Sequence, residues 1–334
     1  YGFYIQSAPL LLICLFCMGT QSTLFGPLKY AILPDYLNDK ELIMGNSLIE
    51  SGTFIAILLG QLLGTAVAGV PPYIVGGLVL LVAVGGTMTS LFMPSVPAKM
   101  PDTKIEWNII KGTNSLIHEA AADRPVFTSI IGISWFWFIG SVYTTQLPTF
   151  TQIHLGGNDN VFNLMLALFS IGIAIGSVLC AKLSHERLIL GLVTIGTLGL
   201  TVCGLLLVWL THGQRFTELN GIIWFLSQAQ AYPIMLVMSA IGFFGGFFSV
   251  PLYTWLQTAS SETFRAHAVA ANNIINGVFM VSAAILSAVL LMLFDSITLL
   301  YLIVAVGNLP LIIYLIKREP RFIGDLTALL KISK

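Results

Sequence analysis

The chain has 334 residues, of which 56% are hydrophobic and only 9% are charged. Ordinary soluble domains contain about 25% charged residues, so this composition excludes a soluble globular protein. The formal net charge is zero, and the lack of a basic excess argues against a nucleic-acid partner.

The apolar residues gather in blocks of the length that a membrane-spanning helix needs. A hydrocarbon layer about 30 Å thick requires roughly 20 apolar residues per helical span. Helices also satisfy their own backbone in lipid, whereas a β-barrel would show shorter, alternating segments. The sequence therefore predicts an all-α polytopic membrane protein embedded in the lipid bilayer. In chain order, the nine predicted spans are Ala8–Leu28, Met44–Val70, Tyr73–Phe92, Val126–Leu147, Phe162–Leu183, Leu188–Leu210, Tyr232–Leu256, Val269–Phe294 and Ile297–Ile316.

The charges of the connecting segments predict the orientation. If the nine helices alternate in direction, one set of segments, which includes the C-terminal tail, carries fourteen Lys and Arg residues. The other set carries only Arg215. Because cytoplasmic loops are enriched in Lys and Arg, we expect the C-terminus to be cytoplasmic. A miscounted helix would mix the two sets, so the asymmetry also supports the count.

An internal repeat relates the first three predicted helices to the last three. Residues 26–28 (GPL) match residues 250–252 (VPL) at an offset of 224. The Gly-x-Phe at 52–54 matches the one at 277–279 at an offset of 225. Two parallel halves of six helices each are the architecture of major facilitator transporters. The repeat therefore predicts a twelve-helix fold, of which this chain contains nine helices and the three others lie upstream. The expected units are the last three helices of the N-terminal half (1–92), a cytoplasmic linker (93–125), a six-helix C-terminal half (126–316) and a cytoplasmic tail (317–334).

Pairs of glycines four residues apart predict close helix contacts, with ordinary tight packing as the alternative. These pairs are Gly60/Gly64, Gly172/Gly176 and Gly242/Gly246. The loop before Tyr232 contains an apolar piece, Ile222–Leu226, which we expect to lie at the non-cytoplasmic interface.

Glu50 is the exceptional charge, because it lies inside a predicted span. Counted from Met44, it lies about 9 Å into the helix at about 1.5 Å per residue. Asn46 and Thr53 share its face by helical spacing. Ionisable groups in the membrane are costly and usually functional. One interpretation is that the segment binds a polar group of a transported substrate, or a cation coupled to transport. The other is that Glu50 is a carboxylate that serves gating or packing.

Lys29, at the end of the first span, could hold a phosphate or could anchor the helix at the interface. Two further polar clusters extend the set of candidate substrate-binding residues. One, in the eighth span, consists of the amides Asn272 and Asn276. The other, in the fourth span, consists of Tyr143, Thr144 and Gln146 and could line a cavity.

The sequence offers no convincing enzyme site, cofactor site or metal site. Cys14 and Cys17 form a C-x-x-C pattern, but their apolar surroundings disfavour the thiolates that redox or zinc chemistry needs. His118 and Asp123 have the spacing of an acyltransferase motif, but they lie in the predicted linker without a surrounding domain. We therefore expect a protein that is not an enzyme.

Residues 26–60 (GPLKYAILPDYLNDKELIMGNSLIESGTFIAILLG) resemble the bacterial lysophospholipid transporters of the major facilitator superfamily. The similarity continues through ISWFWFIGS (133–141) and LALFSIGIAIGS (166–177) and covers essentially the whole chain. It is strongest to versions fused to an acyltransferase and acyl–acyl-carrier-protein synthetase.

The resemblance implies inward movement of lysophosphatidylethanolamine-like lipids across the bacterial inner membrane for re-acylation, by rocking of two halves. Lys29 and Glu50 match polar positions of the family's motifs, which implies a functional role for both. The resemblance also implies a fused or partner acyltransferase. Two alternatives are a general exporter of drugs or other amphiphiles, and a membrane module that serves a fused acyltransferase.

Overall fold

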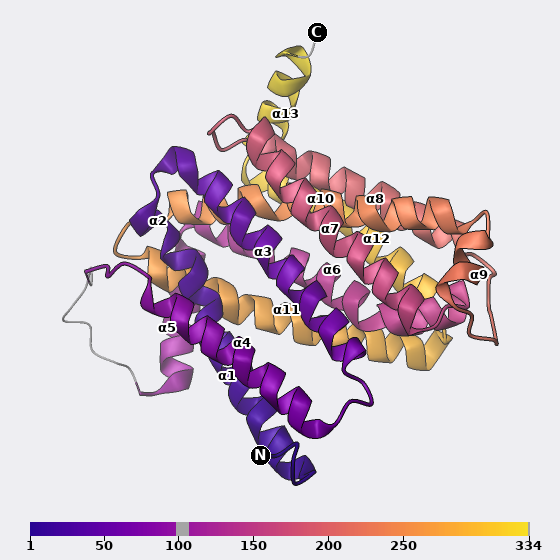
Figure 1. Cartoon of the computed structure of the whole chain (residues 1–334). Helices are drawn as coiled ribbons and strands as arrows, with labels where there is room; N and C mark the ends of the chain where they lie inside the picture. The colour runs from indigo at the N-terminus through magenta and orange to yellow at the C-terminus, as the bar shows by residue number, and fades with distance from the viewer. Residues whose placement is uncertain (98–106, 333–334) are drawn as a thin grey trace.

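The structure, a computed structural model, describes residues 1–97 and 107–332. Nine of the helices in these residues are long and apolar enough to cross a membrane. Their number and order confirm the predicted all-helical membrane fold (Figure 1). The helices are α1 (Ala8–Ala31), α2 (Leu33–Tyr36), α3 (Asp39–Ala66), α4 (Pro72–Leu91), α5 (Ile109–Ala122), α6 (Arg124–Leu155), α7 (Asp159–Leu183), α8 (Gly191–Leu210), α9 (Ile222–Ser227), α10 (Ala231–Ala259), α11 (Arg265–Phe294), α12 (Ile297–Arg318) and α13 (Arg321–Ile332).

Helix ends differ from the apolar blocks wherever polar caps or prolines extend a helix. α3 begins at Asp39 rather than Met44, because Asn38 and Glu41 form a reciprocal capping box. α6 continues through Pro148 and ends at Gly156, whose φ of 60° gives the left-handed conformation that closes many helices. A hydropathy profile reveals neither the polar cap of α3 nor the continuation of α6 through Pro148. The expected depth of Glu50 was therefore wrong: it lies eleven residues after Asp39, or about 16 Å into the helix.

α10 lies at the centre of the described bundle and packs against α6, α7, α8 and α3. A Cβ on Gly176 would come within 2.0 Å of the Phe243 carbonyl oxygen, and a Cβ on Gly242 within 2.1 Å of the Phe169 carbonyl oxygen. The predicted close contact of two glycine pairs is thus confirmed at the α7–α10 interface. For Gly60 and Gly64 it is wrong, because among the described residues nothing lies within 4 Å of a Cβ placed there.

The N-terminal helices meet the rest of the bundle mainly at one end. The buried residues of α1 and α3 all lie between Tyr30 and Leu58. None of the residues of α4, all of which are described, is buried. α2 and α5 lie at this end of the bundle and α9 at the other (Figure 1). The residues around the end of α1 and the first half of α3 therefore form the junction with the C-terminal helices.

The predicted linker contains α5, although its residues 98–106 lie outside the described part, as do residues 333–334 of the predicted tail. Asp123, the acid of the rejected acyltransferase spacing, caps α6 by accepting a hydrogen bond from the Val126 N–H at 3.1 Å. α9 occupies the apolar segment at 222–226, and its position at the non-cytoplasmic interface stays a prediction.

Candidate functional site

Glu50 is fully buried in α3 and binds α1. Its Oε2 accepts a hydrogen bond of 2.7 Å from the Tyr30 hydroxyl on α1. Within the described residues its Oε1 makes no hydrogen bond of ordinary geometry, although the buried Ser249 hydroxyl of α10 lies close enough to interact with the carboxyl group. Buried polar atoms are nearly always paired, so an unpaired carboxylate oxygen marks a position that a ligand or water can use.

Lys29 lies next to this carboxyl group, at the last turn of α1. Its Nζ donates to the Thr53 hydroxyl at 3.0 Å and lies 5.0 Å from the centroid of the Tyr30 ring. Thr53 in turn donates to the Ile49 carbonyl of its own helix at 2.7 Å. The ammonium group is half-buried and is held by one neutral hydroxyl and an aromatic face, which leaves donors for an anion.

Aromatic rings join this polar group to the C-terminal helices. The rings of Tyr30 and Tyr253 stack with centroids 3.9 Å apart and planes inclined by 4°. The Trp137 indole N–H donates to the Tyr253 hydroxyl at 2.8 Å, and Phe54 stacks on Trp137 at 6.5 Å. α1, α3, α6 and α10 therefore meet in one aromatic and polar cluster.

Asn46 is buried, and its side chain forms hydrogen bonds with residues of α10. Its amide nitrogen donates to Gln257 Oε1 at 2.6 Å and to the Thr254 hydroxyl at 3.1 Å. Its oxygen accepts from Gln257 Nε2 at 3.1 Å. In this conformation Asn46 therefore holds helices together rather than offering free polar atoms to a substrate.

We call Lys29, Tyr30, Asn46, Glu50, Thr53, Trp137, Tyr253 and Gln257 the junction cluster. Four of them were predicted as site residues from the sequence. Lys29 and Glu50 are rare charges in an apolar chain, and Asn46 and Thr53 follow Glu50 by helical spacing. Gln257 and Tyr253 were not predicted, although a glutamine in the last turn of an apolar helix was a usable signal.

The other predicted site residues lie elsewhere in the C-terminal helices. Tyr143 is buried against Tyr301, with ring centroids 4.6 Å apart. The Thr144 hydroxyl donates to the Gly140 carbonyl of its own helix at 2.7 Å, and Gln146 is half-buried. Within the described part of the chain, the side chains of these three α6 residues make no hydrogen bond or ring contact with the junction cluster.

The predicted amides of α11 are both buried. Asn276 accepts a hydrogen bond from the Ser134 hydroxyl at 2.7 Å, which ties α11 to α6. Asn272 Oδ1 has no hydrogen-bond partner among the described residues. Asn272 therefore retains an acceptor that a ligand or water can use, whereas Asn276 contributes to packing.

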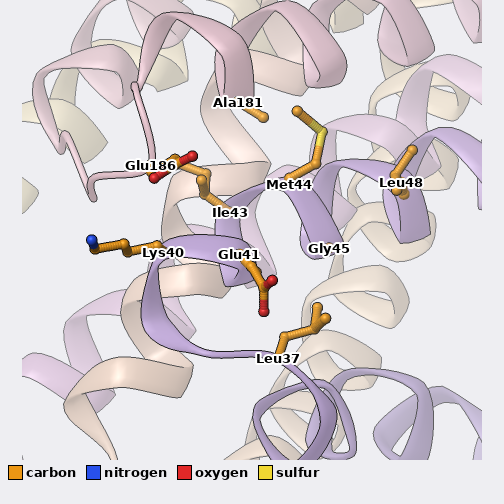
Figure 2. A pocket seen from close by; sticks show the side chains of 9 residues that line it. All are labelled: Leu37, Lys40, Glu41, Ile43, Met44, Gly45, Leu48, Ala181 and Glu186. Carbon is orange, nitrogen blue, oxygen red and sulfur yellow. The ribbon is translucent and has the colours of Figure 1, made fainter.

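A pocket of about 370 Å³ lies on a different face of α3 (Figure 2). Apolar side chains such as Ile43, Met44 and Leu48 line it, and Lys40 and Glu186 lie at its edge. Glu50, Asn46 and Thr53 do not line it. It is therefore separate from the junction cluster.

Comparison with known proteins gives the family. The sequence profile of the Major Facilitator Superfamily matches residues 1–226. The chain is 29% identical over 262 residues to the lysophospholipid transporter LplT of Enterobacter sp. (strain 638). It is 27% identical over the same length to the proteins of that name from Shigella sonnei (strain Ss046) and Escherichia coli (strain K12 / DH10B). The matches confirm the resemblance stated from the sequence.

Each match covers 77% of this chain and 61% of the relative, so the chain spans about three fifths of the length of these proteins. The relatives are named as transporters, in agreement with the prediction that the chain is not an enzyme. The nine candidate spans and the profile match give one conclusion. The chain is a multi-pass membrane protein that belongs to the Major Facilitator Superfamily.

Proposed function

We propose that this protein transports lysophospholipids across a membrane. The proposal is supported by the relatives, which are named lysophospholipid transporters, and by the chemistry of the junction cluster. A lysophosphatidylethanolamine headgroup carries a phosphate and an ammonium group. The cluster offers one cation, Lys29 on α1, and one carboxyl group, Glu50 on α3.

The observation that carries the proposal is the position of Glu50. It is a fully buried carboxyl group with one oxygen that makes no hydrogen bond of ordinary geometry among the described residues. It also lies where α1 and α3 meet the C-terminal helices. Ionisable groups at such positions in membrane proteins mark the paths of substrates or ions. Transport by rocking of two halves would expose this junction in turn to the two sides of the membrane.

We assign Lys29, Glu50 and Thr53 to the headgroup, with Asn272 as a further polar contact. Tyr143, Thr144, Gln146 and Asn276 are assigned to the walls of the path rather than to the headgroup, because their polar atoms are buried or bonded within the C-terminal helices.

The cellular setting follows from the same proposal. Lysolipid moves inward across the bacterial inner membrane and is re-acylated by a fused or partner acyltransferase. Residues 1–92 and 126–316 contribute to the two halves, 93–125 join them, and the tail from 317 lies in the cytoplasm. The excess of Lys and Arg in one set of loops supports this orientation.

The test is uptake of labelled lysophosphatidylethanolamine by proteoliposomes that contain the full-length protein. We expect uptake above that of protein-free vesicles, and no comparable uptake of a diacyl phosphatidylethanolamine. A general exporter would instead move unrelated amphiphiles and show no preference for lysolipid. That result, from folded protein, would replace the proposal with the exporter alternative.

A further inference from the structure

α1 has Pro27 in its interior, besides Pro9 in its first turn, and Pro34 follows in the first turn of α2. Proline has no backbone N–H, so it cannot donate to the carbonyl four residues earlier. Pro27 leaves the Thr23 carbonyl without this donor. The Tyr30 carbonyl lies in the last turn of α1, where helix carbonyls have no internal partner, and Pro34 in α2 has no N–H to offer it. The two carbonyls are seven residues apart, close to two full helical turns, and therefore lie on one face of α1.

Each of these two carbonyls accepts a hydrogen bond from a side-chain amide of the C-terminal helices. Gln257 Nε2 on α10 donates to the Tyr30 carbonyl at 2.8 Å. Asn273 Nδ2 on α11 donates to the Thr23 carbonyl at 3.3 Å. Gly26 permits the second approach, because a Cβ there would lie 3.2 Å from Asn273 Nδ2.

The orientation of the Gln257 amide is fixed by its other bonds. Its oxygen accepts from Asn46 on α3, and its nitrogen donates back to the Asn46 oxygen. Its backbone carbonyl accepts from Arg265 Nε at 2.9 Å. A reversed amide would place two oxygens against each other at Tyr30. Gln257 therefore ties α10 to both α1 and α3 in one defined arrangement.

We propose that Gln257 and Asn273 form a latch with these two carbonyls of α1, and that this latch holds the two halves together at the end where α3 begins. Both are positioning residues of the transport cycle and do not contact the cargo. The inference deepens the proposed function by naming the contact that must break when this end opens.

The chemistry suits a contact that breaks and reforms. Its partners are neutral, so separation leaves no unpaired buried charge, which would be costly. Water can replace each amide at the exposed carbonyl, and the net worth of such a bond is therefore modest. Without Pro27, α1 would satisfy the Thr23 carbonyl internally and would have less need of Asn273.

The latch is tested by measuring the distance between the halves in the full-length protein. Spin labels are placed at Lys40 on α3 and at Ser261 after α10, both exposed. Cys14 and Cys17 are first changed to Ser, because they are the exposed cysteines among those described. Electron–electron double resonance then reports the short-distance and long-distance populations.

The variants Gln257→Met, Asn273→Ala and Pro34→Ala remove the latch in three independent ways. The first keeps the volume, and the third restores a backbone N–H four residues after Tyr30 that can compete for its carbonyl. We expect each to raise the ratio of long to short distances by about fivefold, the factor for one typical hydrogen bond. Thr258→Ala is the matched control, because its hydroxyl bonds only to its own helix at the Thr254 and Trp255 carbonyls.

An unchanged distance distribution in the variants that remain monodisperse would overturn the latch. If Gln257→Met does not fold, the other two variants decide. The measurement needs no lysolipid, so a shifted distribution would support the latch even if the wild-type protein failed to take up lysolipid. Conversely, uptake with an unchanged distribution would refute the latch and leave the proposed function intact.

Discussion

Tyr30 connects the Glu50 carboxyl group to α10. Its hydroxyl binds Glu50, its ring stacks on Tyr253, and its backbone carbonyl accepts from Gln257. The hydroxyl satisfies one oxygen of a fully buried carboxyl group. Without it, both oxygens would lack a hydrogen bond of ordinary geometry among the described residues, which costs free energy.

The variant Tyr30→Phe separates the hydroxyl from the ring. We expect the free energy of unfolding to fall by about 1–3 kcal/mol, the cost of an unsatisfied buried polar group. Lysolipid uptake should fall as well, because Glu50 loses the bond that orients it. Thermal unfolding in detergent and the uptake assay measure the two effects. Tyr36→Phe is the control: Tyr36 is exposed and its hydroxyl binds the Pro94 carbonyl at 2.6 Å. Equal melting temperatures and uptake for the two variants would contradict this role of Tyr30.

Individual residues were predictable where they were chemically unusual in their own helix. Lys29 and Glu50 are charges in apolar surroundings, and spacing added Asn46 and Thr53. The partners Gln257 and Tyr253 lie more than 200 positions away in sequence. Their contacts depend on how separate helices pack, which hydropathy and helical spacing do not contain.

The packing of α7 on α10 depends on glycines at the point where the helices approach most closely. A Cβ on Gly176 would overlap backbone atoms of Phe243, and backbone cannot move aside as a flexible side chain can. Gly60 has open space around it in the described structure. The same Gly-x-x-x-Gly spacing therefore has two different meanings in this chain.

The variants Gly176→Ala and Gly60→Ala test this difference. We expect Gly176→Ala to lower the free energy of unfolding by about 1–3 kcal/mol through overpacking. Gly60→Ala should leave stability unchanged or raise it, because alanine favours helix at an unobstructed position. Thermal unfolding of the two purified variants gives the comparison. Similar losses of stability would show that α7 and α10 do not rely on the close approach.

At the level of elements, the sequence was sufficient for the number and order of the nine long apolar helices in the described residues, but it did not predict the short α2 or α13. Apolar blocks of spanning length carry the information on the long helices. It was insufficient for helix ends and contacts. Asn38 and Glu41 extend α3 by polar capping, and α6 passes through Pro148, neither of which an apolar block reveals.

The whole molecule has an unequal distribution of Lys and Arg between its two sets of loops. We expect reporter fusions after residues 97 and 319 to show cytoplasmic activity, and a fusion near Arg215 to show activity on the opposite side. The physical reason is the bias of Lys and Arg toward cytoplasmic loops. Cytoplasmic activity at all three positions would contradict the alternating orientation of the spans.

The central claim is that Lys29 and Glu50 of the junction cluster bind a lysolipid headgroup. The most direct measurement compares lysophosphatidylethanolamine uptake by the full-length wild-type protein with uptake by the variants Lys29→Ala and Glu50→Gln. The variant Lys182→Ala is the control. Lys182 is an exposed residue at the end of α7. We predict that uptake falls at least about tenfold in the two cluster variants, equivalent to about 1.4 kcal/mol, and is retained in the control. Wild-type uptake in both folded cluster variants would contradict the account.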